Sequence, residues 1–415
     1  MDTGKSAGAD QEVPWRIQAA VYGIGLFSTS IFYIGSVIIP LYAYTLNPSP
    51  FLFGLVFSAA HFLPLFFSIH AGALMDRLGA RRVLLFCTIF GAIVPLFYPL
   101  AFSIYVLILL QMLLGFAESM GWLGAQTLIG QYMRGKTLYA GRLSFFIRAA
   151  PLIAPPLAGV VWDFLGIWAA FILMTIWGSG AVVCALMLPP LPPGATPPRA
   201  PVSSQSKLQT LLPNLADYVT AFSLLARPAV VIVVLLSAMM HLGNSVQNSF
   251  YIAWLNEMGF TGTAIGLLSP IAAVSAALFS LVAVRLLKYM SALWILLISL
   301  WSGIVLICIT PLLGTYFLLQ VAMFLRSGAN GLAQPLIITT VLGGAGRENQ
   351  GKAIGLRATG NRVASILSPL IMGAVAELFG LKWSFFVIGI AVSIGMAAIA
   401  YYLWRRPDIA SASEE

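Results

Sequence analysis

Long apolar runs separated by short polar turns dominate the amino-acid sequence. A helix that crosses a bilayer needs about 20 predominantly apolar residues, and reading the chain for such runs gives twelve segments. Their approximate bounds are 17–44, 52–74, 83–103, 105–132, 141–163, 167–188, 228–256, 263–285, 291–312, 315–343, 352–376 and 383–404. This pattern predicts an all-α membrane protein with twelve transmembrane helices.

A polar interruption between the sixth and seventh runs divides the chain into two halves. Residues 189–201 contain seven prolines, and a segment so rich in proline is extended and semi-rigid rather than helical. The sequence therefore predicts an N-terminal six-helix bundle over residues 1–189 and a cytoplasmic linker over 190–227. A C-terminal six-helix bundle with a short cytoplasmic tail follows over 228–415.

An internal repeat indicates that the two halves are duplicates. Six positions of the fifth run recur in the eleventh run with identical spacings of 7, 7, 4, 4 and 3 residues. The paired positions are Gly141 and Gly355, Arg148 and Arg362, Pro155 and Pro369, Gly159 and Gly373, Asp163 and Glu377, and Gly166 and Gly380. Such repeats are typical of transporters built from two related halves, and they predict two pseudo-symmetric six-helix bundles.

The composition agrees with a chain that lies in lipid. Hydrophobic residues make up 60% and charged residues 8% of the sequence, against about 45–50% and about 25% in a soluble domain. The net charge of +9 does not indicate a nucleic-acid partner, because 18 of the 22 Lys and Arg residues lie at one predicted side of the runs. By the positive-inside rule both termini are cytoplasmic. We expect a multi-pass protein of the bacterial cytoplasmic (inner) membrane, with the first run retained as a helix.

The turn between the second and third runs carries the most specific motif. It is Gly72-Ala-Leu-Met-Asp76-Arg77-Leu-Gly79-Ala-Arg81-Arg82. This pattern, G-x-L-x-D-R-x-G-x-R-R, resembles the signature that major facilitator superfamily transporters carry in the same loop. The resemblance extends over residues 15–405.

The resemblance implies two bundles that rock about a central cavity and expose one substrate site alternately to each side of the membrane. It implies a functional monomer without a cofactor. It also implies a cytoplasmic gate formed by Gly72, Asp76, Arg77, Gly79 and Arg81. The Asp76 carboxylate suits that role, because it can accept N–H groups of a helix N-terminus and pair with arginine. A purely topological anchor is the alternative for this loop.

Glu118 is the first candidate for the transport site, because an ionised group inside a membrane span is costly and needs a function or a partner. It is the only acidic residue far from the ends of its run. Helical geometry places it on one face with Gln111, Trp122 and Gln126, which indicates a cavity wall. Desolvation favours a neutral acid, so Glu118 can carry a coupling proton. The alternative is a permanent ion pair with Arg148 or another buried cation.

The tenth and seventh runs add two more polar faces. Arg326, Asn330 and Gln334 follow each other at intervals of four residues. A guanidinium keeps its charge, so Arg326 requires water, an anionic substrate or a carboxylate such as Glu118. The face of the seventh run consists of His241, Asn244 and Asn248. Hydrogen bonding between helices is the alternative role for these amides.

The resemblance implies that the second, fifth, eighth and eleventh runs form the contact between the bundles. The candidate contact residues are Arg148, Pro155, Gly159, Arg362, Pro369 and Gly373. For the two arginines, snorkelling or gating salt bridges are favoured over a clamp for an anionic substrate.

These features predict a secondary active transporter that moves a small amphipathic organic solute by alternating access, with proton coupling and export favoured. One alternative is an organic-anion importer or exchanger that uses intramembrane arginines, and another is a solute-sensing membrane receptor. An enzyme is not expected, because the chain has no Walker-type loop and no nucleophile–base–acid set. Its three cysteines give no metal-ligand spacing, so no metal or other cofactor is expected. The expected partners are the solute, protons and the lipid bilayer, without nucleic acid.

Overall fold

Helices make up almost the whole of the computed structural model, which describes residues 13–133, 136–190, 228–345 and 350–406. In the N-terminal half they are α1 (Trp15–Thr45), α2 (Pro50–Leu78), α3 (Ala80–Ile93), η1 (Val94–Leu100), α4 (Ile104–Met133), α5 (Thr137–Ile147) and α6 (Ala150–Met187). In the C-terminal half they are α8 (Pro228–Val246), η4 (Gln247–Tyr251), α9 (Ile252–Glu257), α10 (Gly262–Gly266), α11 (Leu268–Leu286), α12 (Ala292–Cys308), η5 (Thr310–Leu312), α13 (Tyr316–Ala345), α14 (Gln350–Phe379) and α15 (Leu381–Arg405). Nearly all of the predicted linker, from residue 191 to 227, lies outside the described residues.

Nine helical segments within these ranges are long and apolar enough to cross a membrane. The longest, Leu138–Met187, has 50 residues, which at about 1.5 Å per residue is more than twice the ~30 Å thickness of the hydrocarbon core. Gly166 interrupts it with a φ of +83°, so the segment can make two crossings. Helix α12 is apolar but has only 17 residues.

The repeat glycines perform the same task in both halves. Gly166 joins the fifth apolar run to the sixth, and Gly380, with a φ of +82°, joins α14 to α15. Glycine adopts this left-handed conformation without the steric penalty that a Cβ atom brings. Each half therefore turns its last two membrane segments through a single glycine.

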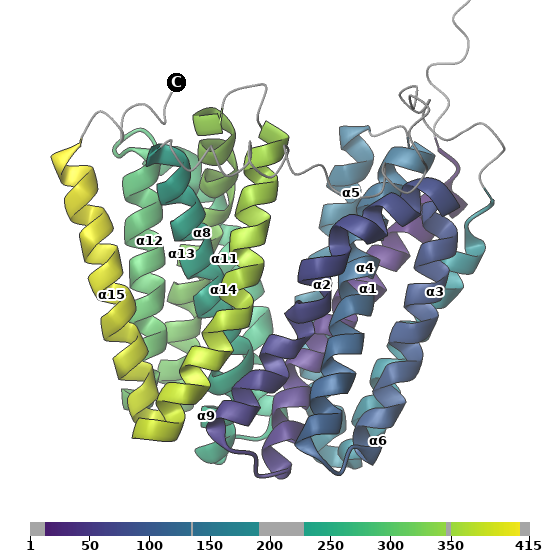
Figure 1. Cartoon of the computed structure of the whole chain (residues 1–415), viewed down its shortest axis with the longest axis horizontal. Coiled ribbons are helices and arrows are strands. Elements are labelled where there is room, and N and C mark those ends of the chain that lie inside the picture. Colours follow the sequence, from purple (N-terminus) through teal and green to yellow (C-terminus); the bar gives the residue numbers. More distant parts are fainter. Residues whose placement is uncertain (1–12, 134–135, 191–227, 346–349, 407–415) are drawn as a thin grey trace, which may run out of the picture.

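The helices form two groups that lie side by side (Figure 1). We call the side on which α1 begins and α15 ends the terminal face, and the other side the opposite face. Helices α1–α6 make one group and α8–α15 make the other. Figure 1 shows the groups converging at the opposite face, near α9, and separating toward the terminal face.

The apolar core has the same arrangement. Near the opposite face one buried cluster contains residues of both halves, including Phe53 of α2 and Phe250 of η4, whose ring centroids are 5.2 Å apart. Toward the terminal face the core divides into a cluster of the N-terminal half around Met120 and a cluster of the C-terminal half around Leu296. The buried core that the halves share thus lies at the opposite face.

Candidate functional site

Two equivalent backbone contacts join the halves at the opposite face. Helix α6 lies against α10, and α14 lies against α2. The carbonyl oxygen of Pro155 occupies the space that a side chain at Gly266 would need, and the carbonyl oxygen of Pro369 does the same at Gly54. Only glycine allows the two backbones to approach so closely, which explains the residue type at Gly54 and Gly266.

The next turn of each helix repeats the contact. Gly159 of α6 lies against the carbonyl of Gly262, and Gly373 of α14 lies against the carbonyl of Pro50. Arg148, another predicted contact residue, is exposed at the end of α5, and its equivalent Arg362 is half-buried in α14. Neither guanidinium forms a hydrogen bond or an ion pair with a residue that the structure describes.

Two carboxylates of the repeat bind helix N-termini across the same contact. Asp163 Oδ1 accepts from the N–H of Gly262 at 2.8 Å, and Asp163 Oδ2 accepts from the N–H and the hydroxyl of Thr263 at 2.7 and 2.6 Å. Glu377 accepts from the N–H of Phe51 at 3.1 Å. A carboxylate satisfies free N–H groups at a helix N-terminus and interacts favourably with the helix dipole. These hydrogen bonds therefore stabilise the closed opposite face.

Replacing Asp163 by alanine should shift the protein away from the conformation that is closed at the opposite face. Hydrogen bonds to an exposed carboxylate are worth about 1–3 kcal/mol in total after solvent screening, which changes a conformational ratio roughly 5–150-fold. Spin labels at the exposed residues Leu165 and Met258 would report the change as a longer distance. Glu377→Ala removes one hydrogen bond and should have a smaller effect. Identical distance distributions in wild type and Asp163→Ala would contradict the role.

The predicted cytoplasmic gate lies in the connection from α2 to α3 at the terminal face. Gly79 has a φ of +83° there, and the N–H of Ala80 donates to Gln131 Oε1 of α4 at 3.3 Å. Arg81 is half-buried, and its Nε has no hydrogen-bond partner among the described residues. The side chains of Asp76 and Arg77 lie outside the described part, and Gly72 is described only as part of the α2 backbone. Their role in a gate stays a prediction.

Asp76→Asn should slow transport by about tenfold, which corresponds to the loss of one charged hydrogen bond of ~1.5 kcal/mol. The variant removes a latch rather than a binding group, so the affinity for the transported solute should remain. Initial transport rates and equilibrium binding, measured on the same reconstituted sample, separate the two effects. A normal transport rate would show that Asp76 only anchors the loop.

Glu118 lies in the middle of α4, and its side chain forms no hydrogen bond or ion pair with any residue that the structure describes. Gln111 is buried and accepts from the Tyr98 hydroxyl at 2.6 Å, so it belongs to the interior of the N-terminal half. Trp122 is 46% exposed, and Gln126 is exposed. An exposed amide facing lipid would be unfavourable. Trp122 and Gln126 are thus accessible, whereas Gln111 is not, and the place of the first two in a cavity wall stays a prediction.

Arg326, Asn330 and Gln334 form a polar stripe along α13. Its residues become more buried with distance from the terminal face. Gln334 is exposed, Asn330 is half-buried, and Arg326 is 5% exposed. Asn330 Nδ2 donates to Asn244 Oδ1 of α8 at 3.2 Å. The structure thus brings together two of the predicted polar faces, those of the seventh and tenth runs.

The stripe of α8 runs parallel to the stripe of α13. His241, whose Nδ1 lies 3.0 Å from the carbonyl oxygen of Ser237, is half-buried, as are Asn244 and Asn248. The sequence predicted one continuous helix, whereas η4 is a π-helical turn over Gln247–Tyr251. Periodicity alone does not reveal such a turn, and π turns are frequent at functional sites. Tyr251, at its end, is 6% exposed.

Arg326 is enclosed by α13, α12 and η4. Its side chain faces Gly303 of α12, Tyr251 lies within electrostatic range, and its Nε has no hydrogen-bond partner in the described part of the chain. In this arrangement no ion pair joins the side chains of Glu118 and Arg326. No ion pair joins Glu118 to Arg148 either.

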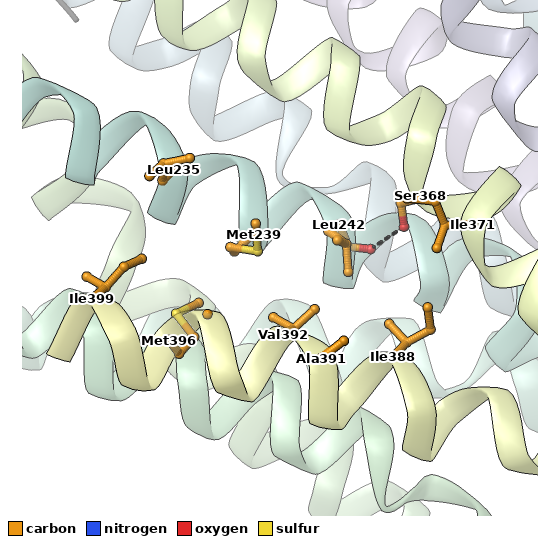
Figure 2. Close-up of a pocket in the computed structure, with 11 residues that line it drawn as sticks. Leu235, Met239, Leu242, Ser368, Ile371, Ile388, Ala391, Val392, Met396 and Ile399 are labelled. Atoms are coloured by element: carbon orange, nitrogen blue, oxygen red, sulfur yellow. Dashed lines mark hydrogen bonds between the residues drawn. The ribbon is translucent and has the colours of Figure 1, made fainter. Parts of the chain in front are cut away.

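The structure also contains an apolar groove that the sequence did not predict. It has a volume of about 410 Å³ and lies between α8, α14 and α15. Figure 2 shows Leu235, Met239 and Leu242 of α8 facing Ile388, Val392 and Met396 of α15 across it. The hydroxyl of Ser368 at its edge donates to the Leu242 carbonyl at 3.1 Å. A solute site needs polar groups that fix orientation, and none of the candidate polar residues lines this groove.

A model of the Major Facilitator Superfamily matches residues 21–243 and 233–415, and the chain therefore belongs to that superfamily. Comparison with curated protein sequences finds no match. Several transporters of known structure resemble it. A mutant of the nucleoside transporter NupG is 17% identical, with a TM-score of 0.74 over 92% of this chain and 99% of that chain.

Two further structures resemble the chain over most of its length. A bacterial homolog of the human lysosomal transporter Spinster, inward-facing and occupied, is 15% identical with a TM-score of 0.68 over 98% of this chain and 92% of that chain. A bacterial homologue of the iron transporter ferroportin, in an inward-facing state, is 15% identical with a TM-score of 0.66 over 94% and 99%. At such identities the likeness establishes the fold. Family and fold together define a secondary transporter.

Proposed function

We propose that this transporter moves a small organic solute with apolar surface across the bacterial cytoplasmic membrane, and that protons bound at Glu118 drive the movement. The observation that carries this proposal is the position of Glu118, a carboxyl group in the middle of α4 without a partner among the described residues. A carboxyl group binds a proton where water is excluded and releases it where water enters. Alternation between two such environments couples proton movement to the movement of the solute.

The halves are proposed to alternate between the arrangement described here and its reverse. If the termini are cytoplasmic, this arrangement faces inward, and the hydrogen bonds of Asp163 and Glu377 hold its outer side closed. The signature loop around Asp76 would hold the cytoplasmic side closed in the reverse arrangement. Each state then has its own set of helix-capping carboxylates, which gives the two states comparable free energies.

The direction that we favour is export of the solute in exchange for protons. The support comes from Pro155 and Gly159 of the fifth apolar run. Both residues lie at the close contact of α6 with α10. Exchange requires that the protein change conformation slowly when neither solute nor proton is bound. The tight backbone contact between α6 and α10 is suited to slow this change.

The test uses purified protein in proteoliposomes that contain a pH-sensitive dye. A panel of nucleosides, organic acids and amphipathic antibiotics is added outside, with and without an imposed pH gradient. We expect at least one compound to cause a change in lumenal pH that protein-free liposomes do not show. A compound that stabilises the protein against heat but moves no protons and does not itself cross would instead identify a solute-sensing receptor.

A further inference from the structure

Arg326 is a buried cation for which the described part of the protein supplies no counter-charge. Its side chain is 5% exposed, and its Nε is buried without a hydrogen-bond partner. The titratable groups within electrostatic range are Tyr251 and Cys308, which are both neutral at physiological pH in their ordinary state. A guanidinium does not lose its proton to relieve such a situation.

The surroundings of Arg326 are suited to a ligand rather than to packing. The neighbour of its side chain on α12 is Gly303, which has no side chain of its own, and the next turn of α13 presents Asn330, which donates to Asn244. That bond uses the oxygen of Asn244 and leaves its Nδ2 without a hydrogen bond to any described residue. Two kinds of N–H donor therefore occur here, the guanidinium of Arg326 on α13 and the amide of Asn244 on α8, and Asn330 links the two helices.

The two polar stripes provide a route to this position. On α13 the polar residues change from exposed at Gln334 to buried at Arg326. On α8 and η4 the half-buried His241 and Asn248 precede the buried Tyr251. Both stripes start toward the terminal face, where the halves separate (Figure 1), and both end beside Arg326. A polar solute that enters from that side meets side chains that can hydrogen-bond along its way.

We propose that Arg326 binds an anionic group of the transported solute, which makes the substrate an organic anion with a carboxylate or phosphate group and an apolar body. The planar guanidinium can donate two parallel hydrogen bonds to such a group. Asn330 and Asn244 lie where they can contact the atoms next to it. This inference rests on the proposed transport function and names the substrate class for the same site.

The first experiment compares the thermal stability of wild type and Arg326→Met in detergent. Removal of a buried charge that lacks a partner should raise the unfolding temperature of the ligand-free protein, because functional sites retain groups that destabilise the fold. Acetate and inorganic phosphate, titrated at constant ionic strength against chloride, should stabilise wild type and leave Arg326→Met unchanged. Arg285→Gln, which removes an exposed arginine at the end of α11, is the control for net charge and should respond as wild type does.

Arg326→Lys keeps the charge and should retain a weakened response to both anions, since lysine cannot donate the paired hydrogen bonds. A lower unfolding temperature for Arg326→Met, or equal stabilisation by anions in wild type and Arg326→Met, would overturn the proposal. A response to phosphate alone would identify a phosphate-bearing substrate, and a response to acetate alone a carboxylate. These measurements need no proton gradient. Anion binding at Arg326 can therefore be absent while proton-coupled transport is present, and anion binding can be present while proton-coupled transport is absent.

Discussion

Glu118→Gln should abolish proton-driven accumulation of the solute while leaving exchange at equal pH on both sides intact. Glutamine has nearly the same shape as a protonated glutamate, so the variant resembles one state of the transport cycle and can still change conformation. Because it cannot release a proton, a pH gradient no longer performs work on the solute. We expect accumulation to fall by at least about 100-fold, as for loss of an essential proton-transfer group.

The measurement is uptake into proteoliposomes with an imposed pH gradient, followed by exchange of labelled for unlabelled solute without a gradient. Gln126→Glu in the Glu118→Gln background asks whether a carboxyl group two turns along α4 restores coupling. Gln126 is exposed on the same helix, which makes this a demanding test of position. Retention of full pH-dependent accumulation in Glu118→Gln would place the proton site elsewhere or exclude proton coupling.

Alanine at Gly54 and Gly266 should prevent the opposite face from closing. A methyl group at Gly54 would collide with the carbonyl of Pro369, and one at Gly266 would collide with the carbonyl of Pro155. A carbonyl within a helix can move away only if the helix moves with it. Overpacking of this type costs about 1–3 kcal/mol for each site. The double variant should therefore populate the reverse arrangement and lose most of its transport activity.

The matched controls are Gly141→Ala and Gly355→Ala. These two glycines are paired positions of the internal repeat, and a Cβ atom at either position meets no neighbouring helix or side chain within 4 Å. Alanine in a helix is about 0.5–1 kcal/mol more favourable than glycine, so these variants should be active and slightly more stable. Spin labels at Leu165 and Met258 should report a longer distance in the Gly54 and Gly266 variant only. An unchanged distance there would mean that the contact is not a gate.

The sequence predicted the architecture well because lipid leaves few choices for a polypeptide backbone. Backbone polar groups in a bilayer must be satisfied within helices, so apolar runs of sufficient length already determine where the membrane segments lie. The position of Gly166 between the fifth and sixth runs followed from the sequence, and the structure shows its interrupting φ of +83°. Family membership, inferred from the loop around Asp76, is confirmed by the match over both halves.

Side-chain neighbours were harder to predict. Helical periodicity gives the direction of a residue around one helix, but not the helix that it faces. Gln111 and Glu118 share a face of α4, but periodicity does not reveal that Tyr98 of η1 donates to Gln111. The sequence left open whether Glu118 pairs with Arg326, because the two residues lie in different halves and periodicity does not show where the halves meet. The π turn of η4 has no signal in the periodicity.

The capping carboxylates show an intermediate case. The repeat identified Asp163 and Glu377 as equivalent, but their role depends on contacts between residues about 100 and 326 positions apart in the chain. An acidic residue close to the end of a membrane segment, in both copies of a repeat, was the available signal. To recognise the capping role, one must also know which helix N-terminus lies opposite each carboxylate.

The single-glycine connections have a mechanical consequence. Because only Gly380 separates α14 from α15, α14 cannot slide along the membrane normal unless α15 moves with it. Helix α15 presents large apolar side chains such as Ile390 and Ile394 to its surroundings, where they are 62% and 65% exposed. We therefore expect a shift of α15 within the surrounding lipid to be passed on to the contact of α14 with α2. On this expectation, bilayer thickness would influence how readily the opposite face opens.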